Sequence, residues 1–221
     1  MFAKVLPLIS LVVLASACSP DPVAVTGLET PEAAVVAWFD SVDAGQPETA
    51  SNATYDQSLA LILGLENGLD AATIAAYLDD GVPISVQASY WASFSEGFVE
   101  FASRPLSTLT VGESVMYSSE GVEFATVPIA NGGAAGAVVI TRMTAEGTWV
   151  VDLVASLGDG FAKLLASNYD VIPIGESGDR IRLAYTQVVV PSLWAALASE
   201  TFVDDFTRTA LAIIESVSRS Q

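Results

Sequence analysis

Residues 106–154 read LSTLTVGESVMYSSEGVEFATVPIANGGAAGAVVITRMTAEGTWVVDLV. Apolar and polar side chains alternate along much of this stretch, and a period of two is typical of half-buried β-strands. The pattern predicts four strands, at 107–117, 122–129, 137–143 and 148–154. The connections between them are short and contain glycine, which favours hairpins. Connections of this length predict an antiparallel meander, since parallel crossovers need about a dozen residues or more.

Helices are predicted on both sides of these strands. Thr30 suits an N-cap and Pro31 the first helical position, so a helix is predicted to begin there and to end at Gly45. Apolar side chains at helical spacing predict further helices at 55–66, 70–80, 86–101, 161–168, 180–199 and 201–218. Helices, then a meander, then helices again indicate an α+β fold.

The first residues have the pattern of an export signal. Lys4 precedes an apolar run at 5–14, and the small residues 15–17 lead to Cys18, the only cysteine in the sequence. The run is shorter than the ~20 residues that span a bilayer. The ending LASAC resembles the lipobox of bacterial lipoproteins. That resemblance implies a signal peptide at 1–17, cleavage before Cys18 and diacylation of the Cys18 thiol; an ordinary signal peptide with a chance cysteine is the alternative.

Two acyl chains hold a protein stably at a membrane. We therefore expect an exported protein that is bound to the lipid bilayer through acylated Cys18, on the outer face of the plasma membrane or on the outer membrane. Residues 18–27 contain two prolines and little periodicity, and they are predicted to form a short tether. The mature chain would have no second cysteine, so it is expected to fold without an internal disulfide.

The composition argues against nucleic-acid binding. The chain has 26 acidic and 8 basic residues and no histidine, which gives a formal net charge of −18. Nucleic-acid phosphates repel such a chain, and so do anionic lipid headgroups. The acidic residues are scattered among 52% hydrophobic residues, which favours a folded acidic surface over a disordered tail.

Three stretches resemble the NTF2-like (cystatin-like α+β) superfamily. They are TPEAAVVAWFDSVDAG at 30–45, GVEFATVPIA at 121–130 and GTWVVDLVA at 147–155. The resemblance implies N-terminal helices packed on a four-stranded antiparallel meander over 28–155, with a cone-shaped pocket between sheet and helices. The C-terminal residues, 156–221, have no counterpart in the minimal fold, and we expect them to form a helical extension packed on the same domain. The fold hosts both enzymes and binding modules, so it implies no particular chemistry.

The sequence has few candidates for catalysis. Without histidine, and with Cys18 acylated, the usual triads and dyads are excluded. A carboxylate could act as a general base, and the candidates are Asp40 with Asp43, or Asp152. Acidic residues that keep the surface soluble are the simpler interpretation. No cofactor or metal is predicted, because the acids in glycine-rich sequence fit ordinary turns and form no calcium-loop motif; these are Asp159, Asp170, Glu176 and Asp179.

Aromatic residues give the other candidate site. Six of them fit either a packed core or the lining of an apolar pocket, namely Trp38, Phe39, Trp91, Phe94, Phe98 and Trp149. The uncharged segment 183–198 is short for a membrane span, so it predicts a buried helix or an apolar face for a partner.

Together these features predict a non-catalytic, membrane-anchored binding or assembly module for a small apolar ligand or an envelope protein. An NTF2-like enzyme with an Asp or Glu general base in a hydrophobic pocket is the alternative.

Overall fold

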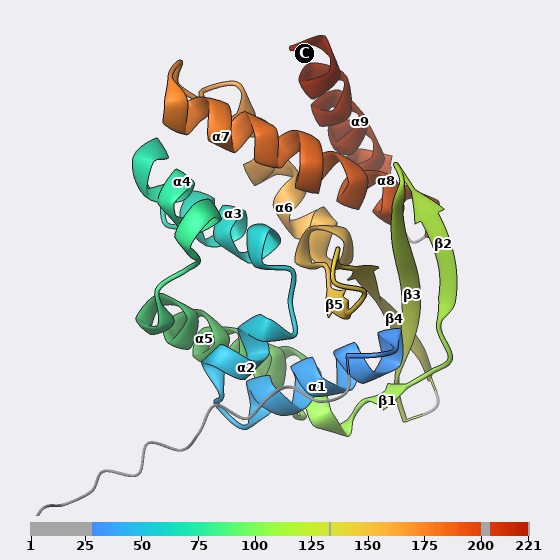
Figure 1. Ribbon diagram of the computed structural model, residues 1–221. Coiled ribbons are helices and arrows are strands. Elements are labelled where there is room, and N and C mark those ends of the chain that lie inside the picture. Colours follow the sequence, from blue (N-terminus) through green and yellow to red (C-terminus); the bar gives the residue numbers. More distant parts are fainter. Residues whose placement is uncertain (1–27, 133, 200–203, 221) are drawn as a thin grey trace, which may run out of the picture.

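The computed structural model describes residues 28–132, 134–199 and 204–220, with the side chains of residues 134 and 135 excepted. The predicted signal peptide, the tether and the lipidation site Cys18 lie outside these residues. The described chain is an α+β fold in which helices pack against one curled antiparallel sheet (Figure 1).

Helices precede the sheet, as predicted. The first, α1, is capped by Thr30, whose hydroxyl accepts a hydrogen bond from the Ala33 N–H at 3.2 Å. Asp70 caps α4 in the same way by accepting from the Thr73 N–H at 3.0 Å. The short helix α2 was not predicted. The five helices are α1 (Pro31–Asp43), α2 (Pro47–Asn52), α3 (Asp56–Glu66), α4 (Ala71–Asp80) and α5 (Ile84–Ala102).

Five strands form the sheet in the described part of the chain, where four were predicted. They are β1 (Thr110–Val111), β2 (Val115–Ser119), β3 (Val122–Asn131), β4 (Ala134–Met143) and β5 (Trp149–Val151). All the pairings are antiparallel, in the order β1-β3-β4-β5, and β2 pairs with the same edge of β3 as β1 does.

The single strand predicted at 107–117 is wrong, because it is divided into a 3-10 turn, β1 and β2. The break lies opposite Pro128 of β3, whose carbonyl accepts from the Gly112 N–H at 2.8 Å. The N–H and C=O of one residue in an antiparallel strand point to the same side. Pro128 has no N–H to offer this edge, so the ladder is interrupted there.

Glu32 of α1 holds the chain that crosses this break. Its carboxylate accepts a hydrogen bond from the Ser114 N–H at 2.7 Å. Hydrogen bonding to Ser114 favours the ionised form and lowers the pKa of the Glu32 carboxyl below its ordinary value of 4.5.

We expect Glu32→Gln to lower stability at neutral pH and to have little effect in acid. A carboxyl with a lowered folded-state pKa stabilises the protein above its ordinary pKa, and this contribution is lost as the pH falls through the folded value. Urea unfolding of both proteins across the range from neutral pH to below the lowered pKa measures the difference. A difference in unfolding free energy between the two proteins that stays constant with pH would contradict the assigned role of the Glu32 carboxylate.

The last strand ends earlier than predicted. Strand β5 stops at Val151, and Asp152 then caps α6 (Leu153–Tyr169) by accepting from the Ala155 N–H at 3.0 Å. The helix predicted at 161–168 therefore begins eight residues sooner, and the glycines at 158 and 160 lie inside it rather than in a loop. Helix α6 also runs across the expected division at 155–156 between the domain and its extension.

A continuous helix follows, as α7 (Glu176–Ala184), the π-helical segment η2 (Tyr185–Val189) and α8 (Val190–Ala198). Pro191 cannot donate to a carbonyl one turn earlier, and a wider π-turn before it accommodates the missing bond. By length and composition Glu176–Ala198 could cross a membrane, but 56% of its most apolar window is buried in the protein. The last helix is α9 (Asp204–Arg219); its predicted cap, Thr201, lies outside the described residues.

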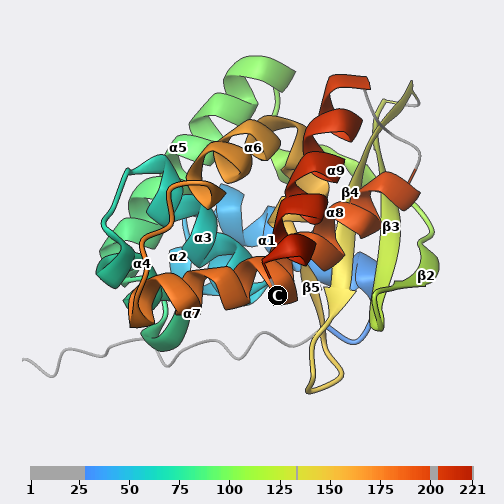
Figure 2. The ribbon, with the colours of Figure 1, turned by 90° about the horizontal axis from the view of Figure 1, so that it is seen from above.

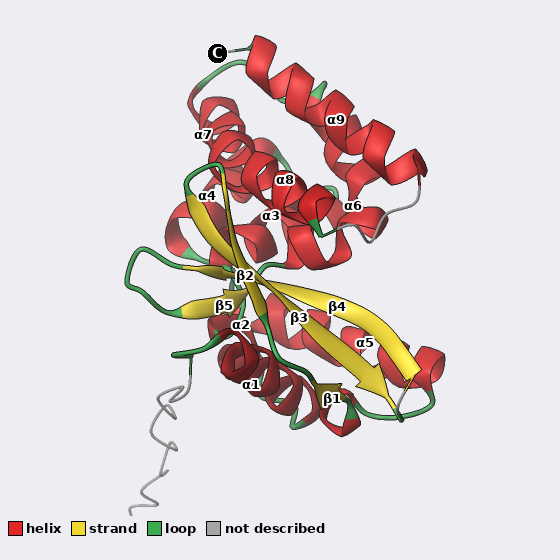
Figure 3. Ribbon diagram, turned by 90° about the vertical axis from the view of Figure 1, so that its right-hand side faces the viewer, coloured by secondary structure: helices red, strands yellow, loops and turns green. Residues whose placement is uncertain are grey.

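Helices cover both faces of the sheet. Figure 3 shows the curled strands with α1 and α5 on one side and α6, α8 and α9 on the other, and the view from above in Figure 2 places α9 across the top of this second group. Both α1 and α6 contact β4. The main core is continuous from Val35 in α1 to Val217 in α9, so the C-terminal helices share the core of the preceding residues.

Candidate functional site

A buried ion pair joins the sheet to the C-terminal helices. Nη1 of Arg142, on β4, lies 3.4 Å from a carboxylate oxygen of Asp152, and the two side chains are 5% and 0% exposed. Charges so far from water are stable only when they are paired and hydrogen-bonded. The pair therefore fixes how β4 meets the start of α6.

Both carboxylate oxygens of Asp152 accept hydrogen bonds from surrounding groups. The hydroxyl of Ser192, on α8, donates to it at 2.6 Å, and that of Ser58, on α3, donates at 3.4 Å. It also accepts from Arg142 and from the N–H of Ala155. Asp152, which the sequence offered as a candidate general base, is thus a buried residue that links α3, α6, α8 and β4 through its hydrogen bonds.

The guanidinium of Arg142 lies over two aromatic rings. The guanidinium carbon lies 3.8 Å from the centroid of the Tyr55 ring and 5.5 Å from that of Phe124. The aromatic contacts and the Asp152 contact together restrain the Arg142 guanidinium.

Tyr117, on strand β2, links the sheet to α8. Burial raises the pKa of Tyr117 to about 12, so its hydroxyl stays protonated and donates to the Ala195 carbonyl at 3.1 Å.

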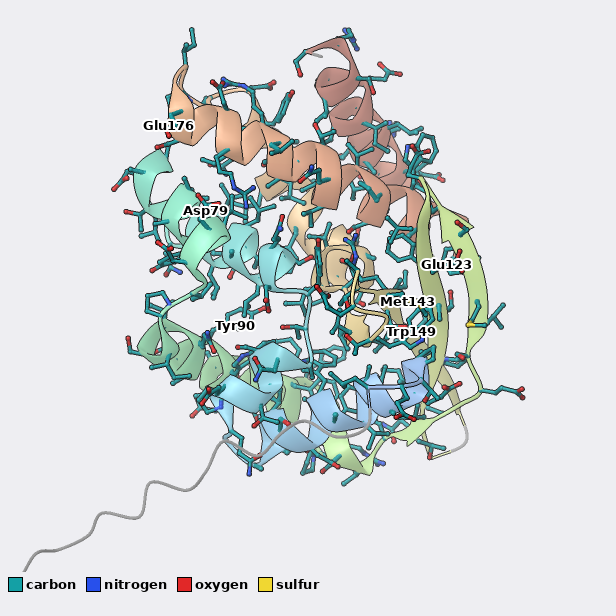
Figure 4. The ribbon with its side chains drawn as sticks, in the orientation of Figure 1. Asp79, Tyr90, Glu123, Met143, Trp149 and Glu176 are labelled. Atoms are coloured by element: carbon teal, nitrogen blue, oxygen red, sulfur yellow. The ribbon has the colours of Figure 1, made fainter. Side chains whose placement is uncertain are left out.

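Only one side-chain nitrogen of Arg142 donates a hydrogen bond within the described structure. Nη1 donates to Asp152, Nε is buried without a hydrogen-bond partner, and Nη2 makes no hydrogen bond but remains accessible. Arg142 lines a cavity of about 380 Å³, which we call the Arg142 hollow. The other residues of its wall are Tyr55, Gly121, Val122, Glu123, Met143, Thr144 and Ala145. Figure 4 shows Glu123 and Met143 at this part of the sheet.

A second cavity, of about 610 Å³, lies on the other side of the β4–β5 turn; we call it the Asp56 hollow. It shares Tyr55, Thr144 and Ala145 with the Arg142 hollow, so the two are adjacent. Surrounding protein atoms raise the pKa of the Asp56 carboxyl above its ordinary value, although the residue keeps contact with solvent. The Gln57 side-chain oxygen is buried there without a partner.

The turn between the hollows is held by its own hydrogen bonds. The Thr144 N–H donates to the Thr148 carbonyl at 2.8 Å, and the two threonine hydroxyls are 2.9 Å apart. Gly147 has φ 80°, a conformation that favours glycine. A fixed turn keeps the shared wall of the hollows in place.

The predicted aromatic site is divided by the fold. Four of the six aromatic side chains form one cluster of rings: Trp38, Phe39, Trp91 and Phe94. The ring centroid of Trp38 lies 5.3 Å from that of Phe39 and 6.2 Å from that of Trp91. The indole N–H of Trp91 donates to the Ser51 hydroxyl at 2.8 Å. These four pack together from α1 and α5, as the packing interpretation expects.

Trp149 and Phe98 lie elsewhere. Trp149 is buried in a separate small cluster with Ala34 of α1 and Ala125 of β3. Phe98 lines an apolar groove of about 330 Å³ between the end of α5 and the β3–β4 hairpin, with Leu109, Ile129 and Ala137. Phe101, also in this groove, is 90% exposed. One of the six predicted residues therefore lines a surface groove.

The remaining acidic candidates have structural or solvent-facing positions. Asp40 is exposed, and Asp43 accepts hydrogen bonds from the N–H groups of Leu106 and Ser107 at 3.3 and 2.7 Å. Asp179 pairs with Arg182 at 3.0 Å. Asp159, Asp170 and Glu176 form no group of three potential metal ligands with other acids of the described chain.

Sequence reasoning missed Arg142 and Tyr55. Arg142 is one of only 8 basic residues and stands in the apolar strand sequence VVITRM, a signal that could have marked it as a buried cation. Tyr55 gave no signal beyond its place before a helix. No family model, curated protein or solved structure matches the chain, so these comparisons assign it to no family.

Proposed function

We propose that the protein is an exported, lipid-anchored binding module with an NTF2-like fold, and that it holds a small ligand in the adjacent hollows beside the β4–β5 turn. The observation that carries the ligand site is Arg142, a buried cation with unused hydrogen-bond donors in the wall of a cavity. Buried polar groups without partners are rare in native proteins, and one in the wall of a cavity is a position that a bound molecule can complete. Cavities of several hundred Å³ are of the size that holds small molecules.

The fold supports this assignment in outline. Helices α1 to α5 precede a curled antiparallel sheet whose last strand carries Trp149, in the order that the NTF2-like resemblance implies. The C-terminal helices extend this arrangement and contribute Ser192 to the junction behind the hollow. The proposed ligand site is at the end of the sheet, where the β2–β3 and β4–β5 turns lie beside the start of α3.

The ligand is tested by recovering it with the protein. Small molecules are extracted from the full chain purified out of its native envelope and compared with those from Ala145→Trp, which places a bulky indole in the wall that the two hollows share. A compound that co-purifies with the wild type and is lost from the variant supports the proposal. If the two extracts are the same, the hollows are not the ligand site.

The anchor is tested at Cys18. We expect Cys18→Ser to abolish acylation and to move the protein from the membrane fraction to the soluble fraction or to leave it as an unprocessed precursor, because two acyl chains supply the membrane affinity. Fractionation and intact mass measure both effects, and Ser19→Ala serves as the matched control. A Cys18→Ser protein that is cut at the same site and stays on the membrane would contradict lipidation.

The apolar groove supports a second candidate function, docking of an envelope protein. A phenylalanine that is 90% exposed beside an apolar cavity is typical of interaction surfaces. A photo-cross-linking residue at Phe101 in intact cells should capture a protein that the same residue at Ile174 does not; Ile174 is 99% exposed but lies in a loop before α7. Equal capture at both positions would argue against docking at the groove.

A further inference from the structure

We infer that the Arg142 hollow recognises an uncharged small molecule through a carbonyl oxygen, which accepts a hydrogen bond from Nη2 of Arg142. This inference rests on the proposed ligand site and names the chemistry that the site selects. The unused donor is the starting point, because Nη1 is committed to Asp152 and Nε is buried without a partner. Nη2 is thus the nitrogen of this side chain that a ligand can reach.

The donor is preorganised. The Tyr55 ring, whose centroid lies 3.8 Å from the guanidinium carbon, and the Asp152 carboxylate, 3.4 Å from Nη1, together restrain the position of the group, which is 5% exposed. A donor that is already held in place loses little conformational freedom when a ligand binds. An acceptor that enters the hollow would therefore meet a donor that is already restrained.

The charges around the hollow favour a neutral acceptor. Asp152 already neutralises Arg142, and a second carboxylate, Glu123, lies in the wall of the hollow. An anionic ligand would meet two carboxylates near one guanidinium, in a chain of net charge −18. An ammonium group has no acceptor electrons to offer Nη2. A carbonyl oxygen accepts the bond without adding charge.

The rest of the wall suits the flat or apolar body of such a molecule. Val122, Met143 and Ala145 provide apolar surface, and Tyr55 provides an aromatic side chain. The volume of about 380 Å³ fits a single small molecule rather than a peptide segment.

Three probes with one ring and different head groups test the inference: benzamide, benzoate and benzylamine. The full chain carries ¹³C-methyl methionine, and Met143 in the hollow reports binding while Met116, exposed on β2, is the internal control. We expect benzamide to shift Met143 but not Met116, with an affinity about tenfold or more above those of benzoate and benzylamine.

Two variants link this binding to Arg142. Arg142→Lys keeps a positive charge for Asp152 but removes Nη2, and it should weaken benzamide binding about tenfold or more. Ala145→Trp places a bulky indole in the wall of the hollow while Arg142 stays unchanged; it should reduce or abolish the Met143 shift, which keeps the test valid if Arg142→Lys folds poorly. Glu96→Gln removes the same charge from an exposed position of α5 outside both hollows; it is the matched control and should leave benzamide binding within about twofold.

The outcomes separate this inference from the proposed function. Benzoate or benzylamine binding at Met143 more tightly than benzamide would overturn the carbonyl preference and leave the hollow as a ligand site. Benzamide binding that Arg142→Lys does not weaken would overturn the role of Nη2. No shift with any probe up to its solubility limit would overturn the inference, whereas the proposed ligand site would fall only with the co-purification test.

Discussion

Asp152→Ala is expected to lower the free energy of unfolding by about 4 kcal/mol, because it leaves the guanidinium of Arg142 buried without its counter-charge. The same change removes the cap of α6, which is typically worth about 1 kcal/mol, and the acceptor of the Ser192 hydroxyl. A domain of ordinary stability has only about 5–15 kcal/mol in total. Urea unfolding followed by circular dichroism measures the change.

The matched control is Asp79→Ala. Asp79 also pairs with an arginine, Arg180, at 2.5 Å, but its side chain is 56% exposed. Exposed pairs contribute about 0–1 kcal/mol, since water replaces the lost partner. Equal losses for the two variants would contradict the assigned role of Asp152.

A double variant separates the charge from the other contacts. Arg142→Met combined with Asp152→Ala removes both members of the pair, and replacing a buried ion pair by apolar groups is often nearly neutral. We expect the double variant to recover part of the stability that Asp152→Ala loses. If it is less stable than Asp152→Ala, the unpaired charge is not the main cause of the loss.

Gly178→Ala is expected to destabilise the protein by about 3 kcal/mol. A Cβ atom at this position, near the start of α7, would lie 1.8 Å from the carbonyl oxygen of Pro173. The obstacle is backbone, so it cannot rotate away as a side chain can, and the loop must move away from the helix. The expected result is a lower urea midpoint together with faster hydrogen exchange at the start of α7.

Gly160→Ala provides the comparison. Gly160 lies inside α6, and a Cβ atom there has nothing within 4 Å. Alanine is the better helix former by about 0.5–1 kcal/mol, so this substitution should stabilise the protein. If Gly178→Ala were also neutral or stabilising, the close approach of Pro173 to Gly178 would be wrong.

The local signals of the sequence predicted much of the fold. Thr30 and Asp70 cap the helices that their positions indicated, and β3 and β4 lie where the alternation placed them. These signals succeed because a cap or a period depends on residues close together in the chain. The strand predicted at 148–154 is present as β5 but its predicted end is wrong, because the apolar start of α6 continues the apolar pattern of β5 and Asp152 between them was not recognised as a cap.

The candidate site was much less predictable. Strand β4 is covered by α1 on one face and α6 on the other, and residues 139–142 are all buried. Alternation cannot assign an inward face to a strand that is buried on both sides. The partners of Arg142 are also distant in sequence, as with Tyr55, so the cluster has no sequence signature.

The sequence by itself determined the α+β class, most of the helices and the position of the β3–β4 hairpin, because each depends on neighbouring residues. It also provides the export pattern that ends in Cys18, on which the proposed anchor depends. Only the tertiary structure decided that Asp152 is a buried junction, that Trp38 and Trp91 pack in the core, and that Arg142 lines a hollow with donors unused. Those outcomes depend on which distant elements fold against one another, and burial and pairing then set the chemistry of each side chain.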